Sequence, residues 1–152
     1  MAKVSEKLQQ AIDGLVIQDV YLKSSKAHCA EGFDPKSTEL DSLLVQQMHV
    51  VHRSELVQIN DDGQLVRIYV RMGTRWVSQI DSEESDIKAH IEADFIAEYQ
   101  LTAELEQDAI DEFALKNASF HVWPYWREFL SSQCERLRLP RVVLPTVQFS
   151  KQ

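Results

Sequence analysis

The side chains that could hold a metal are His28, Cys29, His49 and His52, and their spacing does not suit one ion. Successive side chains of a strand point to opposite faces, so His49 and His52, three residues apart on a predicted strand, cannot converge on a tetrahedral centre. The four glycines are isolated in the sequence and form no phosphate-binding loop. The sequence therefore predicts neither a metal site nor a cofactor.

Groups for acid–base or nucleophilic catalysis are equally scattered. The adjacent carboxylates Glu83–Glu84 and Asp111–Glu112 are expected by chance in a chain with 24 acidic residues. No G-x-S-x-G elbow occurs, and no nucleophile stands with a base and an orienting group. The sequence favours a binding protein over an enzyme and predicts no catalytic residue.

The aromatic cluster Trp123, Tyr125 and Trp126 has two interpretations. Large aromatic side chains commonly anchor the interface between a sheet and a helix. Alternatively, they form the wall of a groove for an extended apolar peptide. Pro140 and Pro145 prevent the tail from being a fully paired central strand, so it is expected to leave apolar surface uncovered.

Length and charge narrow the class of protein. The chain has 152 residues, enough for one domain with a proper core, and a formal net charge of -8, which argues against nucleic-acid binding. Half of the 24 acidic residues lie between Asp81 and Glu112, where Lys88 is the one basic residue. This acidic sector is interpreted either as a solubilising face or as a face that steers a basic partner.

The sequence also predicts the compartment. No apolar run approaches the ~20 residues that a membrane-spanning helix needs, and the first residues are amphipathic and charged, unlike a signal peptide. We therefore expect a cytoplasmic protein without membrane insertion, in which Cys29 and Cys134 are reduced.

Hydrophobic periodicity predicts strands first and helices after them. The predicted elements are a helix over 1–13, strands over 15–27, 43–59, 65–80 and 86–101, a helix over 102–118, a helix from Pro124 to Pro140, and an extended tail over 141–149. A slip in the alternation at Asp19 indicates a β-bulge. Segregated strands and helices predict an α+β fold: a four-stranded antiparallel meander sheet with helices packed on one face. The predicted organisation is an N-terminal helical extension (1–14) and one domain (15–149).

The last third of the chain resembles the end of the SecB protein-export chaperone family. The segment WPYWREFLSSQCERLRLPRVVLPTVQF matches the family pattern at Pro124, Tyr125, Arg127, Glu128, Pro140, Leu144, Pro145 and Phe149, with Gln148 where the family usually has Asn. IEADFIAEYQL (91–101) is similar to the family's fourth strand, and VYLKSS (20–25) is similar to its first. The resemblance spans most of residues 15–149.

This resemblance implies a cytoplasmic, ATP-independent holdase that assembles as a dimer or a dimer of dimers and binds unfolded polypeptides. Family members dock on the SecA motor through acidic residues of the flat sheet, and among these Glu92 matches. Ser24 and His28 stand at the acidic positions of the first strand. Export members continue into another helix and an acidic tail, whereas this sequence ends at Gln152, like SecB-like chaperones that serve one antitoxin beside its toxin.

The predicted client groove combines the second strand with the last helix and the tail: Leu44, Met48, Val50, Trp126, Leu139, Val142 and Leu144. The phase of the second strand is open, so that Val45, His49 and Val51 could line the groove instead. The acidic composition favours basic clients. Two alternatives to a general export holdase remain: a chaperone dedicated to one antitoxin, and a carrier of small apolar ligands.

Overall fold

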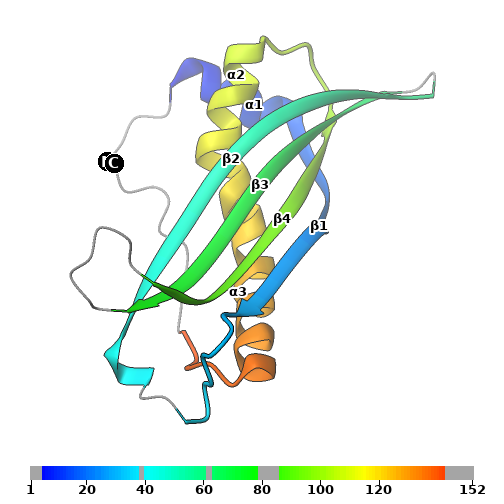
Figure 1. Ribbon diagram of the computed structural model, residues 1–152. Helices are drawn as coiled ribbons and strands as arrows, with labels where there is room; N and C mark the ends of the chain where they lie inside the picture. The colour runs from blue at the N-terminus through cyan, green and yellow to red at the C-terminus, as the bar shows by residue number, and fades with distance from the viewer. Residues whose placement is uncertain (1–4, 38–39, 61–62, 79–85, 143–152) are drawn as a thin grey trace.

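One antiparallel sheet and a long helical segment form the molecule (Figure 1). A computed structural model describes residues 5–37, 40–60, 63–78 and 86–142. The elements are α1 (Glu6–Gly14), β1 (Leu15–Cys29), a 3-10 turn η1 (Leu40–Ser42), β2 (Leu43–Ile59), β3 (Gly63–Ser78), β4 (Ile87–Leu101), α2 (Gln107–Phe113), a π-helical turn η2 (Ala114–Ala118) and α3 (Ser119–Leu137). The α+β class, with helices on one face of a four-stranded antiparallel sheet, is confirmed.

The strand order is β1-β4-β3-β2. The predicted meander holds for β2, β3 and β4, whereas β1 pairs with β4 and not with β2. This pairing buries β4 between two partners and leaves β1 and β2 as the two edges of the sheet. The predicted bulge is confirmed, because the β1–β4 register shifts between Ile17 and Asp19.

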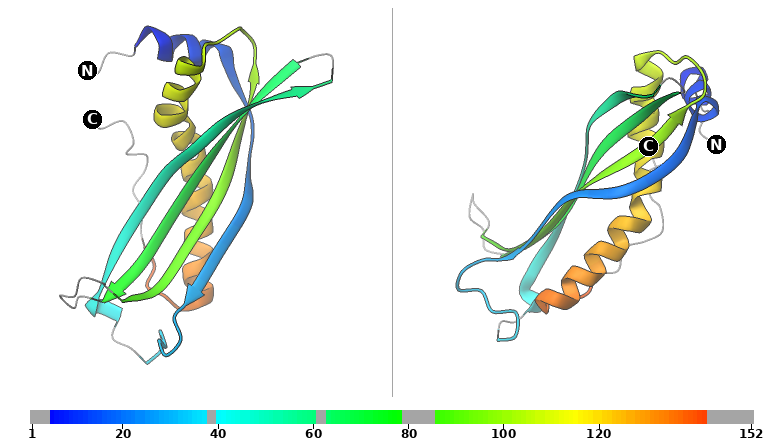
Figure 2. Two further views of the ribbon diagram at one scale, coloured as in Figure 1. Left: turned by 45° about the horizontal axis from the view of Figure 1, so that its top comes forward. Right: turned by 90° about the vertical axis from the view of Figure 1, so that its right-hand side faces the viewer.

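Alternation along β3 and β4 decides which face the helices cover. Val66, Ile68, Val70 and Met72 of β3 are at most 1% exposed, and they pair with Tyr99, Ala97, Phe95 and Ala93 of β4, which are also buried. Residues opposite one another in an antiparallel pair project to the same side of the sheet. We call this side, on which α2 and α3 pack, the helix face, and the opposite side the open face (Figure 2).

The helical region departs from its prediction in two ways. Thr102 does not cap a helix, because its backbone N–H and its hydroxyl both donate to the carbonyl of Gly14, and α2 begins five residues later at Gln107. Pro124 does not begin a new helix but lies inside α3, on its exposed side. A proline there removes one backbone hydrogen bond, and the burial of Trp126 and Leu130 on the opposite side of α3 offsets that loss.

Helix α1 packs against α2 and joins the same core. Leu8 and Ala11 are buried in the cluster that also contains Ile110 and Phe113. The Ser5 hydroxyl accepts from the Leu8 N–H at the N-cap and donates to Glu112, which ties the start of α1 to α2.

Substitutions at the adjacent residues Tyr125 and Trp126 distinguish an exposed aromatic side chain from one that packs in the core. Trp126 is 1% exposed and Tyr125 is 48% exposed. Trp126→Ala is expected to lower the free energy of unfolding by about 3–5 kcal/mol, because it leaves a large cavity. Tyr125→Ala is expected to change it by less than about 1 kcal/mol. Urea denaturation followed by circular dichroism measures both, and equal losses in the two variants would contradict the core role of Trp126.

Candidate functional site

Strand β2 exposes more apolar side chains than any other described element. Leu44, Met48 and Val50 pair with Val77, Gly73 and Arg71 of β3, whose neighbours along the strand project to the helix face, so all three lie on the open face. They are 49%, 39% and 39% exposed. They form a strip along the sheet edge, which we call the β2 strip (Leu44, Met48, Val50).

The predicted groove residues do not form one surface. Trp126 and Leu139 belong to the core on the helix side, with exposures of 1% and 6%. Val142 is half-buried beside α3, and Leu144 lies outside the described residues. The prediction that Trp126 and Leu139 line an open groove together with the β2 strip is therefore wrong for this conformation, because the sheet lies between the two groups.

The alternative phase of β2 lies on the helix face. Val51 packs against the core, and Val45 is 44% exposed. The His49 ring is hydrogen-bonded to the hydroxyl of Ser119, which connects β2 to the first residue of α3. Burial lowers the pKa of His49, which favours the neutral ring. His49 thus joins the strand to the helix.

A second histidine, the half-buried His121, belongs to α3 itself. The Tyr99 hydroxyl and His121 Nδ1 lie 2.8 Å apart, and the Tyr99 ring packs edge-on against Phe113. Burial lowers the pKa of His121 and raises that of Tyr99, so both groups are uncharged near neutral pH. The Tyr99 hydroxyl and His121 Nδ1 are hydrogen-bonded to each other, and this pair joins β4 to α3.

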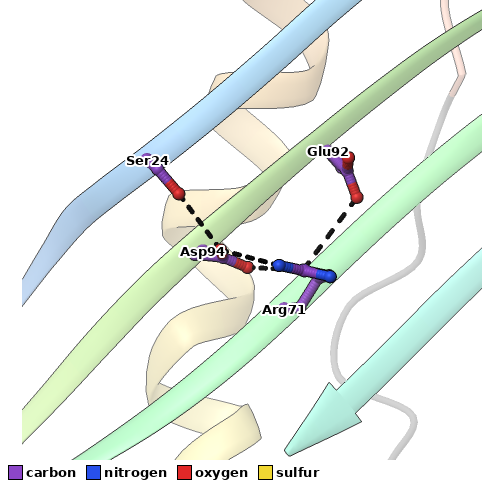
Figure 3. A network of polar contacts seen from close by, with 4 residues as sticks. All are labelled: Ser24, Arg71, Glu92 and Asp94. Carbon is purple, nitrogen blue, oxygen red and sulfur yellow. Dashed lines mark hydrogen bonds and ion pairs between the residues drawn. The ribbon is translucent and has the colours of Figure 1, made fainter. Parts of the chain in front are cut away.

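The open face carries an ion-pair network across three strands (Figure 3). Arg71 of β3 donates from Nε and from Nη2 to the two carboxylate oxygens of Asp94 of β4, at 2.7 and 3.0 Å. The hydroxyl of Ser24 on β1 donates to Asp94 at 3.0 Å, and Glu92 lies 4.0 Å from Arg71 Nε. The hydrogen bonds from Arg71 are the largest cause that lowers the pKa of Asp94.

A second group of pairs continues along the same face. Arg67 Nε donates to Glu98 at 2.9 Å, and the Tyr69 hydroxyl donates to Glu55 at 2.9 Å. The guanidinium of Arg53 lies 4.0 Å from the centre of the Tyr69 ring. Asp94 and Glu98 of β4 thus each pair with an arginine of β3, and Glu92, opposite Gly73, shares Arg71 with Asp94.

A hollow of about 770 Å³ lies beside the β2 strip on the open face. Its lining includes Met48, Gly73, Arg75, His90 and Glu92 from the three strands β2, β3 and β4. Glu92, the residue predicted for SecA-type docking, thus stands at the edge of this hollow and within reach of Arg71. Sequence reasoning missed Gly73, Arg75 and His90. The sequence does show Arg67, Arg71 and Arg75 at every fourth position, on one side of β3. Only the register with β4 shows which of these arginines lies opposite a carboxylate.

Within residues 5–37, 40–60, 63–78 and 86–142, no three His, Cys, Asp or Glu side chains are grouped so that they could hold a metal ion. No helix in this part of the chain has the length and apolar character to cross a membrane.

Comparison with solved structures identifies the fold. The chain matches the SecB-like chaperone of Mycobacterium tuberculosis that was solved with a ChAD peptide from the HigA1 antitoxin, with a TM-score of 0.72 and 16% identity over 95% of this chain and 98% of that one. The fold is SecB-like. A protein of unknown function from Streptococcus agalactiae matches more weakly, with a TM-score of 0.41 and 11% identity over 86% of this chain and 96% of that one. No family model and no curated protein matches the sequence.

The SecB-like fold confirms the resemblance that the C-terminal third and the fourth strand indicated. Four of the matching positions lie in α3, next to the buried Trp126 in sequence, and all four are on the exposed side of the helix: Pro124, Tyr125, Arg127 and Glu128. At 16% identity the match shows the fold, and the chemistry of the site must come from this chain's own side chains.

Asp94 gives the open face a measurable dependence on pH. Asp94→Asn is expected to lower the free energy of unfolding by about 1 kcal/mol at neutral pH, because the variant loses the paired ionic hydrogen bonds to Arg71. Since the pKa of Asp94 is lowered in the folded state, its contribution is present above its ordinary value and disappears as the pH falls below about 4. In urea titrations the two proteins should therefore differ at neutral pH and converge in acid.

A control for this experiment is Asp108→Asn. Asp108 pairs with Lys7 at 3.0 Å, but its side chain is 72% exposed, so its loss should be within about 0.5 kcal/mol of zero. A difference between Asp94→Asn and the unmodified protein that persists unchanged in acid would contradict the ionic role of Asp94.

Proposed function

We propose that this protein is a molecular chaperone that binds nonnative polypeptide segments without ATP. The observation that carries the proposal is the β2 strip, a row of apolar side chains exposed on an edge strand of a SecB-like fold. Burying apolar area is worth about 25 cal/mol per Å² and reads sequence only loosely, which suits a binder of unfolded chains. An edge strand also offers unpaired backbone groups to an extended segment.

The client is proposed to be an antitoxin segment. The structural neighbour was solved with a peptide from an antitoxin, and the match covers nearly all of both chains. A role in general protein export is the alternative, and it would require docking of a basic SecA-type partner on Glu92. Because Glu92 lies within 4.0 Å of Arg71, such a partner would have to compete with an existing ion pair. The antitoxin client is therefore preferred.

A carrier of small apolar ligands is less well supported. Such a carrier needs space between the sheet and the helices. Val122, Trp126 and Leu130 of α3 are at most 1% exposed and pack against the helix face. Packed side chains occupy the place where the ligand would bind.

Self-assembly is proposed through the edge strand β1. Val16, Ile17 and Leu22 are 46%, 42% and 44% exposed on this strand, whose outer edge is not paired in the described sheet. An exposed apolar edge strand is a template for pairing with another chain. A second copy of this protein would cover these side chains and extend the sheet, and weak client patches on each copy would then act together.

The β2 strip is tested by a double substitution on one face of the strand. Leu44→Ser with Met48→Ser is expected to weaken binding of a reduced, unfolded client roughly tenfold or more, since each side chain contributes about 1 kcal/mol of apolar burial. Suppression of client aggregation, followed by light scattering, measures the loss. The matched control is Leu115→Ser, which removes an apolar side chain that is 62% exposed on the helical side.

A second variant tests which face of β2 binds the client. Val45→Ser with Leu56→Ser removes exposed apolar side chains from the helix face of the same strand. Loss of activity only in this variant would move the client site to the other face. If the unmodified chain fails to suppress aggregation of several unfolded clients, the chaperone proposal is discarded.

Assembly is tested by placing charge on the exposed edge. Ile17→Lys with Leu22→Lys is expected to dissociate the oligomer into particles of 17.5 kDa, because lysines on an edge strand prevent pairing. Sedimentation velocity measures the mass, and Leu115→Lys is the control for added charge. A mass of 17.5 kDa for the unmodified protein at micromolar concentration would refute self-assembly.

A further inference from the structure

The hollow beside the β2 strip combines an apolar floor with a cation that has no carboxylate partner among the described residues. Arg75 is exposed, and its Nε donates to the side-chain oxygen of Gln46 at 2.6 Å. Among the described residues no carboxylate lies within 4.0 Å of its guanidinium, although Arg67 and Arg71 on the same face both have one. Arg75 is therefore the β3 arginine of this face that remains available to a ligand.

Two histidines and one lysine surround Arg75 on the open face. His90 lies next to Arg75 in the β3–β4 register, and His28 of β1 lies next to His90, with the two rings 5.6 Å apart. Burial is the largest cause that lowers the pKa of His90, and the positive charge of Lys26, on the same side of β1, lowers it further. The His90 ring is therefore neutral near neutral pH, and Lys26 is the cation beside it. Among the described residues at the hollow, Glu92 is offset by Lys26 opposite it in the register, and Arg71 is already paired with Asp94. Arg75 is then the positive charge that remains in excess.

The floor of the hollow is apolar and adaptable. Gly73 has no side chain, and the methyl group of Met48 lies over it, only 2.8 Å from where a Cβ on that glycine would stand. Ile87, which is 43% exposed, lies at the same hollow. An unbranched methionine can shift to fit different apolar groups. The hollow can thus take a bulky apolar side chain next to the guanidinium of Arg75.

Charges close to Arg75 affect a ligand there more than the net charge of the chain does. Screening limits interactions between exposed charges to about 8 Å at physiological ionic strength. The formal charge of -8 therefore contributes little at a contact with Arg75, and the neighbouring side chains decide which ligand is favoured.

We infer that this hollow selects client segments in which a carboxylate stands next to a bulky apolar side chain. Arg75 binds the carboxylate as a planar, two-pronged donor, and Met48, Gly73 and Ile87 receive the apolar side chain. The inference rests on the proposed function, because it names the chemistry of the polypeptide that the β2 strip binds. It reverses the expectation from composition that the clients are basic.

The test uses three matched peptides that differ only in the residues placed between their apolar side chains. Each carries alternating apolar residues, with Glu, Gln or Lys at the positions between them and a neutral fluorescent label. Fluorescence polarisation at physiological ionic strength measures the dissociation constants. The Glu peptide is expected to bind about tenfold more tightly than the Gln peptide, the value of one charge-assisted hydrogen-bonded pair, and the Lys peptide least tightly.

Two substitutions connect this preference to the hollow. Arg75→Glu is expected to remove the preference for the Glu peptide, and Arg136→Glu, the same charge change on the exposed end of α3, is expected to leave it intact. Gly73→Ala is expected to displace the Met48 methyl group into the hollow and to weaken the Glu peptide several-fold. Circular dichroism verifies that each variant is folded.

The possible outcomes separate this inference from the proposed function. If the chain suppresses aggregation of unfolded clients but binds the Glu and Lys peptides equally, the inference is overturned and the chaperone proposal stands. Equal weakening of the Glu peptide by Arg75→Glu and Arg136→Glu also overturns it, because net charge would then explain the binding. Competition by a single-stranded oligonucleotide with the same dependence on Arg75 would overturn the assignment to peptide.

Discussion

The packing of α3 on β4 and β3 is the interaction on which the rest of the structure depends. Trp126 stacks on Phe129 along the helix, and Phe129 meets Phe95 of β4 edge-on. These contacts cover one face of the sheet over β1, β4 and β3. Strand β2, at the far edge, is left with little helical cover. Val45 and Leu56 on the helix face of β2 stay exposed for that reason. The β2 strip is exposed because it lies on the open face, away from the helices, and a surface for polypeptides becomes possible there.

The antiparallel register of β3 and β4 determines which charged side chains lie opposite one another on the open face. It sets Arg67 opposite Glu98 and Arg71 opposite Asp94, so that opposite charges lie side by side across two strands. A sheet face with such pairs is polar but nearly neutral. Arg75 continues the arginine spacing one step further, where its neighbour in β4 is His90 and not a carboxylate. The break in the pattern creates the charge on which ligand selection depends.

The likeness to a SecB-like chaperone at 16% identity shows how little sequence the fold requires. Alternating apolar residues on β3 and β4 and one apolar stripe on α3 are sufficient, and many residue choices satisfy both. The same scaffold can therefore carry different partner surfaces. In this chain the residues at the hollow differ in charge from an acidic docking face, which is a property of its own side chains.

Much of the fold followed from local patterns. The bounds of the second strand, the bulge in the first and the α+β class were all predicted, because alternation and turn residues act over a few positions. The helix boundaries were predicted less well. The hydroxyl of Thr102 binds Gly14, a residue 88 positions away, and no local pattern announces that contact.

Local residue patterns predict that β2 is a strand rich in apolar residues, but they do not predict which of these residues are exposed. Apolar residues occupy both phases of this strand, Leu44, Met48 and Val50 in one and Val45 and Val51 in the other, so its alternation is the same whichever side the helices take. The position of α3 decided the phase. Only tertiary packing and strand register bring Met48, Gly73, Arg75 and His90 from three strands to one hollow, because these contacts join residues far apart in the chain.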